Sequence, residues 1–211
     1  SGRTELVRAI YGIDPFDSGT IKYLGKPYSP TVEKSIAGGY GFVPEERRLQ
    51  GIMGAISITG NIGIANLDSI STPLGFVSGA KEQERASKAI STLNIKPANP
   101  NHLVGNLSGG NQQKVVVGKW LIRDLKLLIV DEPTVGVDIG AKEEMYQTIE
   151  RLSSEGVAVI VVSSDLPELT RLSDRIIVLR TGRIIKEFTE GVVTEEQVLR
   201  AASGIVEGGA K

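Results

Sequence analysis

The chain has 211 residues, a length that suits one large domain or one domain with an inserted lobe. Its 24 basic and 25 acidic residues nearly balance and aromatic residues make up 5%, so neither a nucleic-acid partner nor a platform for stacking bases is indicated. The absence of cysteine excludes disulfides, thiolate metal sites and cysteine nucleophiles. No run approaches the roughly 20 apolar residues that a membrane-spanning helix needs.

The first half of the chain predicts short elements and then a change in character. The expected elements are a helix at residues 4–11, strands at 21–24 and 40–43, and a helix at about 81–93. From about residue 51 to residue 105 the character changes: a stretch rich in Ser, Thr and Gly precedes the second helix, and Lys96-Pro97 closes that helix. We interpret this part as a helical lobe inserted into an α/β core.

Helices and strands alternate regularly through the second half. The expected elements are helices at residues 108–122, 141–153 and 166–172, strands at 125–130 and 158–162, and a hairpin of 175–179 with 183–187. Thr194 opens a last helix, with Gln197 three residues on as in a capping box. Unbroken apolar strands that alternate with helices imply an α/β fold with a mainly parallel sheet covered on both faces.

Residues 107–114, Leu-Ser-Gly-Gly-Asn-Gln-Gln-Lys, form the most specific motif. Ser108 can cap the helix behind it, and Gly109 and Gly110 let the backbone come close to a phosphate. The helix N-terminus offers free N–H groups and a positive dipole end to an anion. The plain alternative for this segment alone is a serine-capped helix after a glycine turn.

Residues 127–134, Leu-Leu-Ile-Val-Asp-Glu-Pro-Thr, read as a buried strand that ends in two carboxylates. Ligands bind at such strand ends in open parallel sheets. Asp131 can hold Mg²⁺ through water, and Glu132 can orient and deprotonate an attacking water. The plain alternative is an acidic turn after a strand.

Together these two motifs resemble the ATP-binding cassette family: residues 107–112 match its signature and residues 127–132 match its Walker B strand. Residues 135–138 lie where the family has its D-loop, 161–165 where it has the switch, and 42–45 where it has the Q-loop. Gly2-Arg3-Thr4 looks like the end of the phosphate loop, G-x-x-x-x-G-K-[ST]. The resemblance implies a P-loop NTPase-like fold with an inserted α-helical lobe, incomplete at the N-terminus, and ATP and Mg²⁺ as cofactors.

The resemblance also assigns roles to individual residues. Glu132 and Ser164 stand at catalytic positions, and the nucleotide-binding positions are Gly2, Arg3, Thr4, Glu5 and Glu45. Thr4 and Asp131 are the expected metal ligands, and Asp138 belongs to the D-loop. The signature residues Leu107, Ser108, Gly109, Gly110, Asn111 and Gln112 are expected to contact ATP in trans.

The same resemblance divides the chain into four parts. Residues 1–50 are expected to form a partial RecA-like core with the end of Walker A and the Q-loop. Residues 51–124 form the helical lobe with the signature, 125–190 form the core with Walker B, D-loop and switch, and 191–211 form a C-terminal helix and tail.

Three positions depart from the family pattern. Arg3 stands where Lys is expected, Glu45 where Gln is expected, and Ser164 where His is expected. The lone histidine, His102, precedes the signature and cannot replace the missing one. Residues 2–6, 44–47, 111–114 and 163–166 together resemble the second cassette of tandem ATPases in bacterial importers of ribose, galactose, xylose and the autoinducer sugar.

This subfamily resemblance implies a division of labour between two stacked cassettes. The signature here would complete the competent ATP site of a second cassette, in the same polypeptide or in a dimer mate. The site on Arg3, Asp131, Glu132 and Ser164 would bind nucleotide and turn over slowly. Because the chain is expected to start inside its own phosphate loop, the isolated chain is expected to hydrolyse little ATP.

Transmembrane permease subunits are the other expected partners, with the chain peripheral on the cytoplasmic face of the plasma membrane. The expected coupling region covers residues 45–103; Arg47, Arg48, Met53 and Ile56 are candidate contacts, and each could equally be a plain surface or core position. Two alternatives stay open. One is a degenerate, nucleotide-sensing regulatory cassette, and the other is a relative acting in translation or DNA repair, which the lack of basic patches and coiled-coil insertions disfavours.

Overall fold

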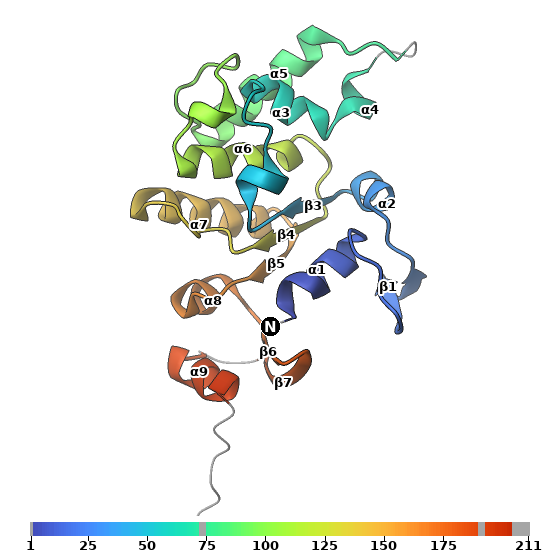
Figure 1. Cartoon of the computed structure of the whole chain (residues 1–211), viewed down its shortest axis with the longest axis vertical. Helices are drawn as coiled ribbons and strands as arrows, with labels where there is room; N and C mark the ends of the chain where they lie inside the picture. The colour runs from blue at the N-terminus through green and yellow to red at the C-terminus, as the bar shows by residue number, and fades with distance from the viewer. Residues whose placement is uncertain (1, 72–74, 190–192, 204–211) are drawn as a thin grey trace, which may run out of the picture. The chain divides into compact units, whose positions relative to one another are not determined.

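The computed structural model describes residues 2–71, 75–189 and 193–203 (Figure 1). The chain divides into two compact units. The first combines Ser1–Val32 with Val161–Lys211, and the second is Glu33–Ile160. The four-part division expected from the sequence stays a prediction.

The described part of the first unit contains two antiparallel strand pairs and three helices. Its elements are α1 (Arg3–Tyr11), β1 (Ile21–Tyr23), β2 (Lys26–Tyr28), α8 (Leu166–Leu172), β6 (Ile176–Arg180), β7 (Arg183–Phe188) and α9 (Glu195–Ser203). Thr181 and Gly182, both at positive φ, form the turn between β6 and β7, as the sequence predicts. Strand β1 ends one residue earlier than expected, because Leu24 is in the left-handed region and begins the turn to β2.

Helix α9 packs on the β6–β7 pair through Val198, which lies in one buried cluster with Ile176 and Val178. The predicted capping box opens this helix: the Thr194 backbone N–H donates to Gln197 Oε1 at 2.9 Å, and the Gln197 N–H donates to Thr194 Oγ1 at 3.3 Å. The expected tail lies outside the described residues, which end at residue 203.

The second unit is built on a sheet with helices packed around α6. Its elements are α2 (Val32–Ala37), β3 (Tyr40–Val43), a π-helical turn η1 (Arg47–Gly51), α3 (Ile58–Ile64), α4 (Leu67–Ile70), α5 (Gly79–Leu93), a 3₁₀ turn η2 (Val104–Asn106), α6 (Gly109–Leu121), β4 (Leu127–Asp131), α7 (Ile139–Ser154) and β5 (Ala158–Val162). Strand β4 lies between β3 and β5, and β3 runs parallel to β4. Helix α6 lies between the α3–α5 group and α7 (Figure 1).

Helix α6 is held to the sheet by one tryptophan. Trp120 Nε1 donates to the Phe42 carbonyl at 3.0 Å, and a Cβ on Gly41 would come within 2.7 Å of the Trp120 ring. Only glycine at position 41 therefore lets the indole lie against β3. This contact thus fixes the position of α6 on the sheet that contains the Walker B strand.

Strand β2 and helices α2, α3 and α4 are not predicted from the sequence. Helix α3 contains Gly60 and Gly63, which are poor helix formers, so its local propensity is low. It forms because Ser57 caps it, accepting from the Gly60 N–H at 3.2 Å, and because Ile58 and Ile62 are fully buried. Tertiary packing overrides propensity here.

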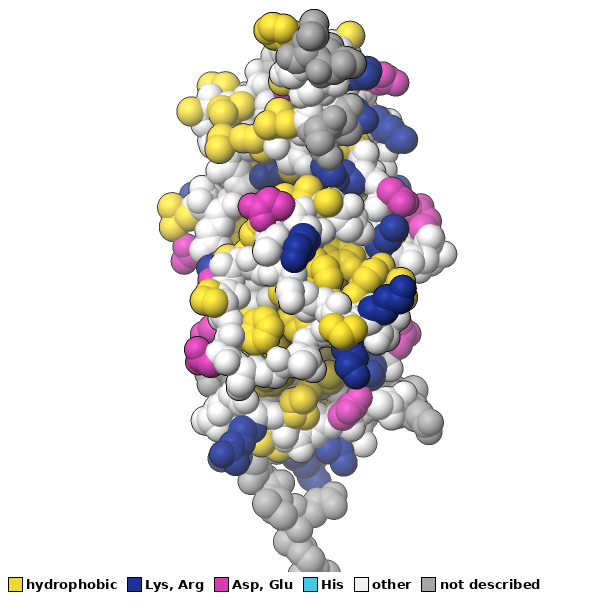
Figure 2. Space-filling view, turned by 90° about the vertical axis from the view of Figure 1, so that its right-hand side faces the viewer, with side chains coloured by type: hydrophobic (Ala, Val, Ile, Leu, Met, Phe, Trp, Pro, Cys, Tyr) yellow, Lys and Arg dark blue, Asp and Glu magenta, His cyan; other side chains and the backbone are white. Residues whose placement is uncertain are grey.

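The α/β fold class with a parallel sheet is confirmed. None of the helices in the described part of the chain is long and apolar enough to cross a membrane. Figure 2 shows one face, on which basic and acidic side chains alternate with hydrophobic ones.

Candidate functional site

The Walker B strand ends in a buried and strained turn. Asp131, the last residue of β4, is fully buried, and Glu132 behind it is 9% exposed. Glu132 has φ 48°, in the left-handed region that a residue with a side chain rarely adopts. Such strain persists only where the surroundings impose it, and it is common at functional sites.

The chemistry of Asp131 fits the expected metal. A buried carboxylate is a hard oxygen donor, and a nearby cation offsets the cost of burying its charge. Within residues 2–71, 75–189 and 193–203, no group of three or more His, Asp or Glu side chains is placed to hold a metal ion alone. Mg²⁺ in a nucleotide site takes one or two protein oxygens and completes its shell with phosphates and water, so the Asp131 carboxylate fits such a site.

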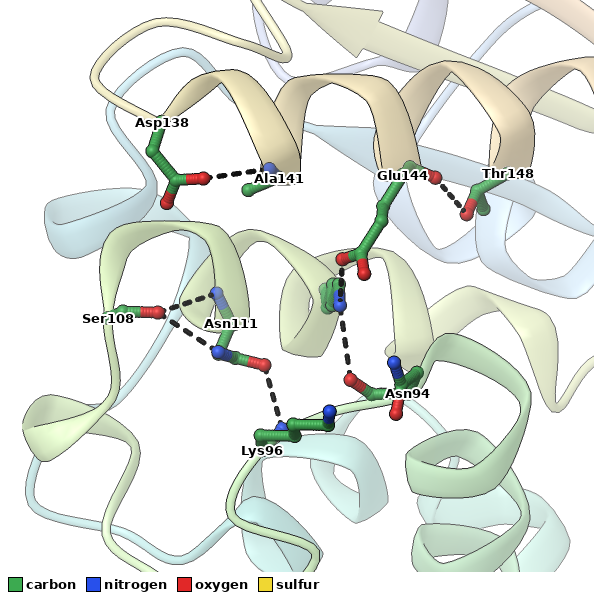
Figure 3. A network of polar contacts seen from close by, with 9 residues as sticks. Asn94, Lys96, Ser108, Asn111, Asp138, Ala141, Glu144 and Thr148 are labelled. Atoms are coloured by element: carbon green, nitrogen blue, oxygen red, sulfur yellow. Dashed lines mark hydrogen bonds and ion pairs between the residues drawn. The ribbon is translucent and has the colours of Figure 1, made fainter.

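The signature begins helix α6 and is tied to the loop before it. Ser108 is exposed and caps the helix, accepting from the Asn111 N–H at 3.4 Å and from Asn111 Nδ2 at 3.0 Å (Figure 3). Asn111 Oδ1 accepts from the Lys96 N–H at 2.8 Å, so the segment after α5 is joined to the signature. Gln112 is 2% exposed and donates to the Leu107 carbonyl at 3.2 Å.

The D-loop lies against the signature helix. Asp138 caps α7 by accepting from the Ala141 N–H at 2.9 Å (Figure 3). A Cβ on Gly110 would come within 2.4 Å of the Ala141 side chain, so glycine is required where the two helix starts meet. The expected D-loop residue therefore also has a structural role as a helix cap.

Lys114 joins three helices behind the signature. Its side chain forms an ion pair with Glu144 of α7 and donates to the Asn94 carbonyl, at the end of α5, at 3.1 Å (Figure 3). Lys114 itself is only 7% exposed. Lys114 thus connects the start of α6 both to α7 and to the end of α5.

One contact beside the expected site is not predicted from the sequence. Arg47, two residues after the Q-loop position Glu45, donates to the carbonyl oxygens of Val135 and Gly136 in the D-loop. Glu45 itself is exposed. No sequence signal marks this contact, because its partners are backbone oxygens 88 and 89 residues away.

The other predicted residues belong to the first unit. Gly2, at φ 91°, is the N-cap of α1, and Arg3, Thr4 and Glu5 form its first turn. Arg3 Nη1 donates to the Ser163 carbonyl at 2.6 Å, so the structure brings Arg3 to the switch segment beside the exposed Ser164. Gly2, Arg3, Thr4, Glu5 and Ser164 thus share one unit, while the second unit holds the signature, Walker B, the D-loop and Glu45.

Curated relatives share most of this chain. It is 42% identical over 205 residues to an import ATP-binding protein of Rhizobium etli named for ribose, galactose and methyl galactoside, covering 97% of this chain and 39% of that protein. It is 44% identical over 207 residues to the ribose import ATP-binding protein RbsA of Oceanobacillus iheyensis, covering 97% of this chain and 41% of that protein. The chain thus spans about two fifths of the length of these relatives.

A solved structure and a family model agree with the fold. A dimeric ATP-binding cassette in a post-hydrolysis state, bound to ADP and Pi, matches with a TM-score of 0.76 at 21% identity over 90% of this chain and 82% of that chain. A likeness at this identity shows the fold. The family model described as ABC transporter matches residues 1–135. Because that match covers more than half of the 211 residues, the chain belongs to the ABC transporter family.

Proposed function

We propose that this chain is the nucleotide-binding part of a sugar-importing ABC transporter and that its signature completes the ATP site of a second cassette. The observation that carries the proposal is the exposed Ser108 at the start of the 13-residue helix α6. Free N–H groups and the positive end of the helix dipole are available there to a phosphate that another molecule presents. The sugar-import names of the relatives support the transport class.

By their positions in the family's motifs, the residues proposed to contact the chain's own nucleotide are Gly2, Arg3, Thr4, Glu5 and Ser164 of the first unit and Glu45, Asp131 and Glu132 of the second. The motifs assign Thr4 and Asp131 to Mg²⁺, which when bound neutralises phosphate charge. Arg3 already donates to the Ser163 carbonyl, so its guanidinium is partly committed to the protein. With Ser164 in place of an imidazole as well, we infer slow turnover at this site.

A second cassette and permease subunits are the proposed partners, on the cytoplasmic face of the plasma membrane. The matched solved structure is itself described as a dimer, which supports a paired arrangement. Met53 and Ile56 are 49% and 38% exposed and suit a docking role. Arg48 is also exposed, and its Nε donates to Gln112 Oε1 at 3.4 Å. Arg47 suits it less, because its guanidinium is engaged with the D-loop.

The assignment of roles can be tested in the assembled transporter with Ser108→Arg and Glu132→Gln. We expect Ser108→Arg to lower sugar transport and steady-state ATP hydrolysis at least about 100-fold, because it blocks the site that turns over. Glu132→Gln should lower them far less. Ser153→Arg, the same change at an exposed position of α7, is the matched control.

The reverse outcome would sink this assignment: transport lost with Glu132→Gln and retained with Ser108→Arg. A second candidate function, nucleotide sensing without hydrolysis, is favoured by the Arg3–Ser163 bond and by Ser164. Single-turnover hydrolysis in the intact protein distinguishes it. Sensing alone predicts bound ATP that the site of Glu132 never cleaves.

A further inference from the structure

Arg47 reaches from the start of η1 to the turn that follows Walker B. Nη1 donates to the Val135 carbonyl at 2.7 Å, and Nη2 donates to the Gly136 carbonyl at 3.1 Å. Two nitrogens of one planar group thus hold two consecutive carbonyl groups. Hydrogen bonds from a charged donor are roughly twice as strong as neutral ones.

The turn that Arg47 holds has two left-handed residues and two long backbone hydrogen bonds. Its backbone is in the left-handed region at Glu132, φ 48°, and again at Gly136, φ 68°. The backbone bonds inside it are 3.3 Å from the Val135 N–H to the Glu132 carbonyl, and 3.4 Å from the Val137 N–H to the Thr134 carbonyl. Strand β4 anchors one end, the Asp138 cap anchors the other, and Arg47 adds a tether in the middle.

The same guanidinium also lies close to Gly109 of the signature. A Cβ on Gly109 would lie 2.8 Å from Arg47 Nη2 and 2.9 Å from the Gly136 carbonyl oxygen. Partial burial lowers the pKa of Arg47, and the charge of Arg48 lowers it further. The fold therefore keeps a cation where burial disfavours it, at the junction of η1, the turn and the first turn of α6.

We propose that Arg47 is a positioning residue that sets the turn carrying Glu132 against Gly109 of the signature. The inference rests on the proposed function, since it assigns Arg47 to the geometry of the two nucleotide-contacting segments. Lysine cannot replace it, because a single ammonium group does not present the two-nitrogen fork that the consecutive carbonyl groups accept.

The test compares Arg47→Lys with Arg151→Lys, the same change at the far end of α7, in the full-length protein. We expect Arg47→Lys to speed hydrogen exchange at residues 133–138 and to lower kcat for ATP about tenfold with KM unchanged, because one charge-assisted bond is lost. Exchange in β4 and in the middle of α6 should not change, which shows that the fold is intact. Arg151→Lys should match the wild type in every measurement.

A second variant separates positioning from a general structural role. Arg47→Ala should show the same faster exchange and lower kcat, and millimolar methylguanidinium should restore both. The proposal is overturned if Arg47→Lys matches the wild type in exchange and kcat, or if methylguanidinium restores neither. If instead the wild type itself neither binds nor hydrolyses ATP, the proposed function fails, and the exchange result still decides whether Arg47 holds the turn.

Discussion

At the scale of single residues, the surroundings of one lysine, Lys119, change its pKa. Lys119 of α6 is mostly buried and donates through Nζ to the Gly51 carbonyl at the end of η1. Burial lowers the pKa of Lys119 from 10.5 to about 8. Removing an ammonium group from water disfavours its charged form, and this cost falls on the folded state only.

This shift makes stability depend on pH. Between pH 8 and pH 10.5 the folded state has lost the Lys119 proton and the unfolded state still binds it, so stability rises with pH across this window. Against Lys119→Met, the wild type should gain at most about 3 kcal/mol of unfolding free energy from pH 7 to pH 10.5. Urea unfolding of both proteins at pH 7, 8, 9 and 10 measures the difference. Parallel pH curves would contradict the prediction.

At the scale of elements, the position of α6 follows from contacts with its neighbours. Lys114 joins it to α7 through Glu144 and to the end of α5 through the Asn94 carbonyl. Lys114 is 7% exposed, whereas the Glu144 side chain is 46% exposed. Loss of the carboxylate therefore leaves a largely buried ammonium group with weaker compensation.

Glu144→Gln tests how much this brace contributes. We expect a loss of about 1–2 kcal/mol in unfolding free energy, because a neutral amide replaces the charged acceptor of Lys114. Glu155→Gln, the same change at an exposed position after α7, should change it by less than about 0.5 kcal/mol. Urea titration gives both values. Equal effects at the two positions would show that the ion pair contributes nothing specific.

At the scale of the whole molecule, burial is distributed unevenly between the sheets. The central strand β4 has Leu128, Ile129 and Val130 fully buried, whereas every residue of β7 except Phe188 is exposed. Amide exchange is slowest where opening must disrupt the most buried contacts. The two kinds of sheet should therefore differ in local stability.

Native-state hydrogen exchange can measure this difference. The slowest amides should be those of residues 128–130 in β4, together with those of Val115, Val116 and Val117 in the buried middle of α6. The amides of β1, β2 and β7 should exchange at least about tenfold faster. Protection in β7 equal to that in β4 would contradict this distribution of stability.

Several elements and motif residues could be predicted from the sequence alone, because their signals are local. The bounds of β5 and α8 agree with the prediction, and so do the turn at Thr181 and Gly182 and the capping box of Thr194 and Gln197. The apolar run, the cap and the turn residue each act within a few positions of themselves. The motifs at residues 107–112 and 127–132 also identify the family from the sequence alone.

The rest was decided by contacts between distant residues. Helix α3 forms despite the low helix propensity of its two glycines, because neighbouring helices bury Ile58 and Ile62. Gly41 is required only because Trp120 lies against it, and Arg47 holds a turn 88 residues away. Short motifs determine which residues are available for phosphate chemistry. Tertiary packing determines the strained φ of Glu132 and the contacts of the signature helix with its neighbours. Backbone strain and close contacts between distant residues exist only once the folded neighbours impose them.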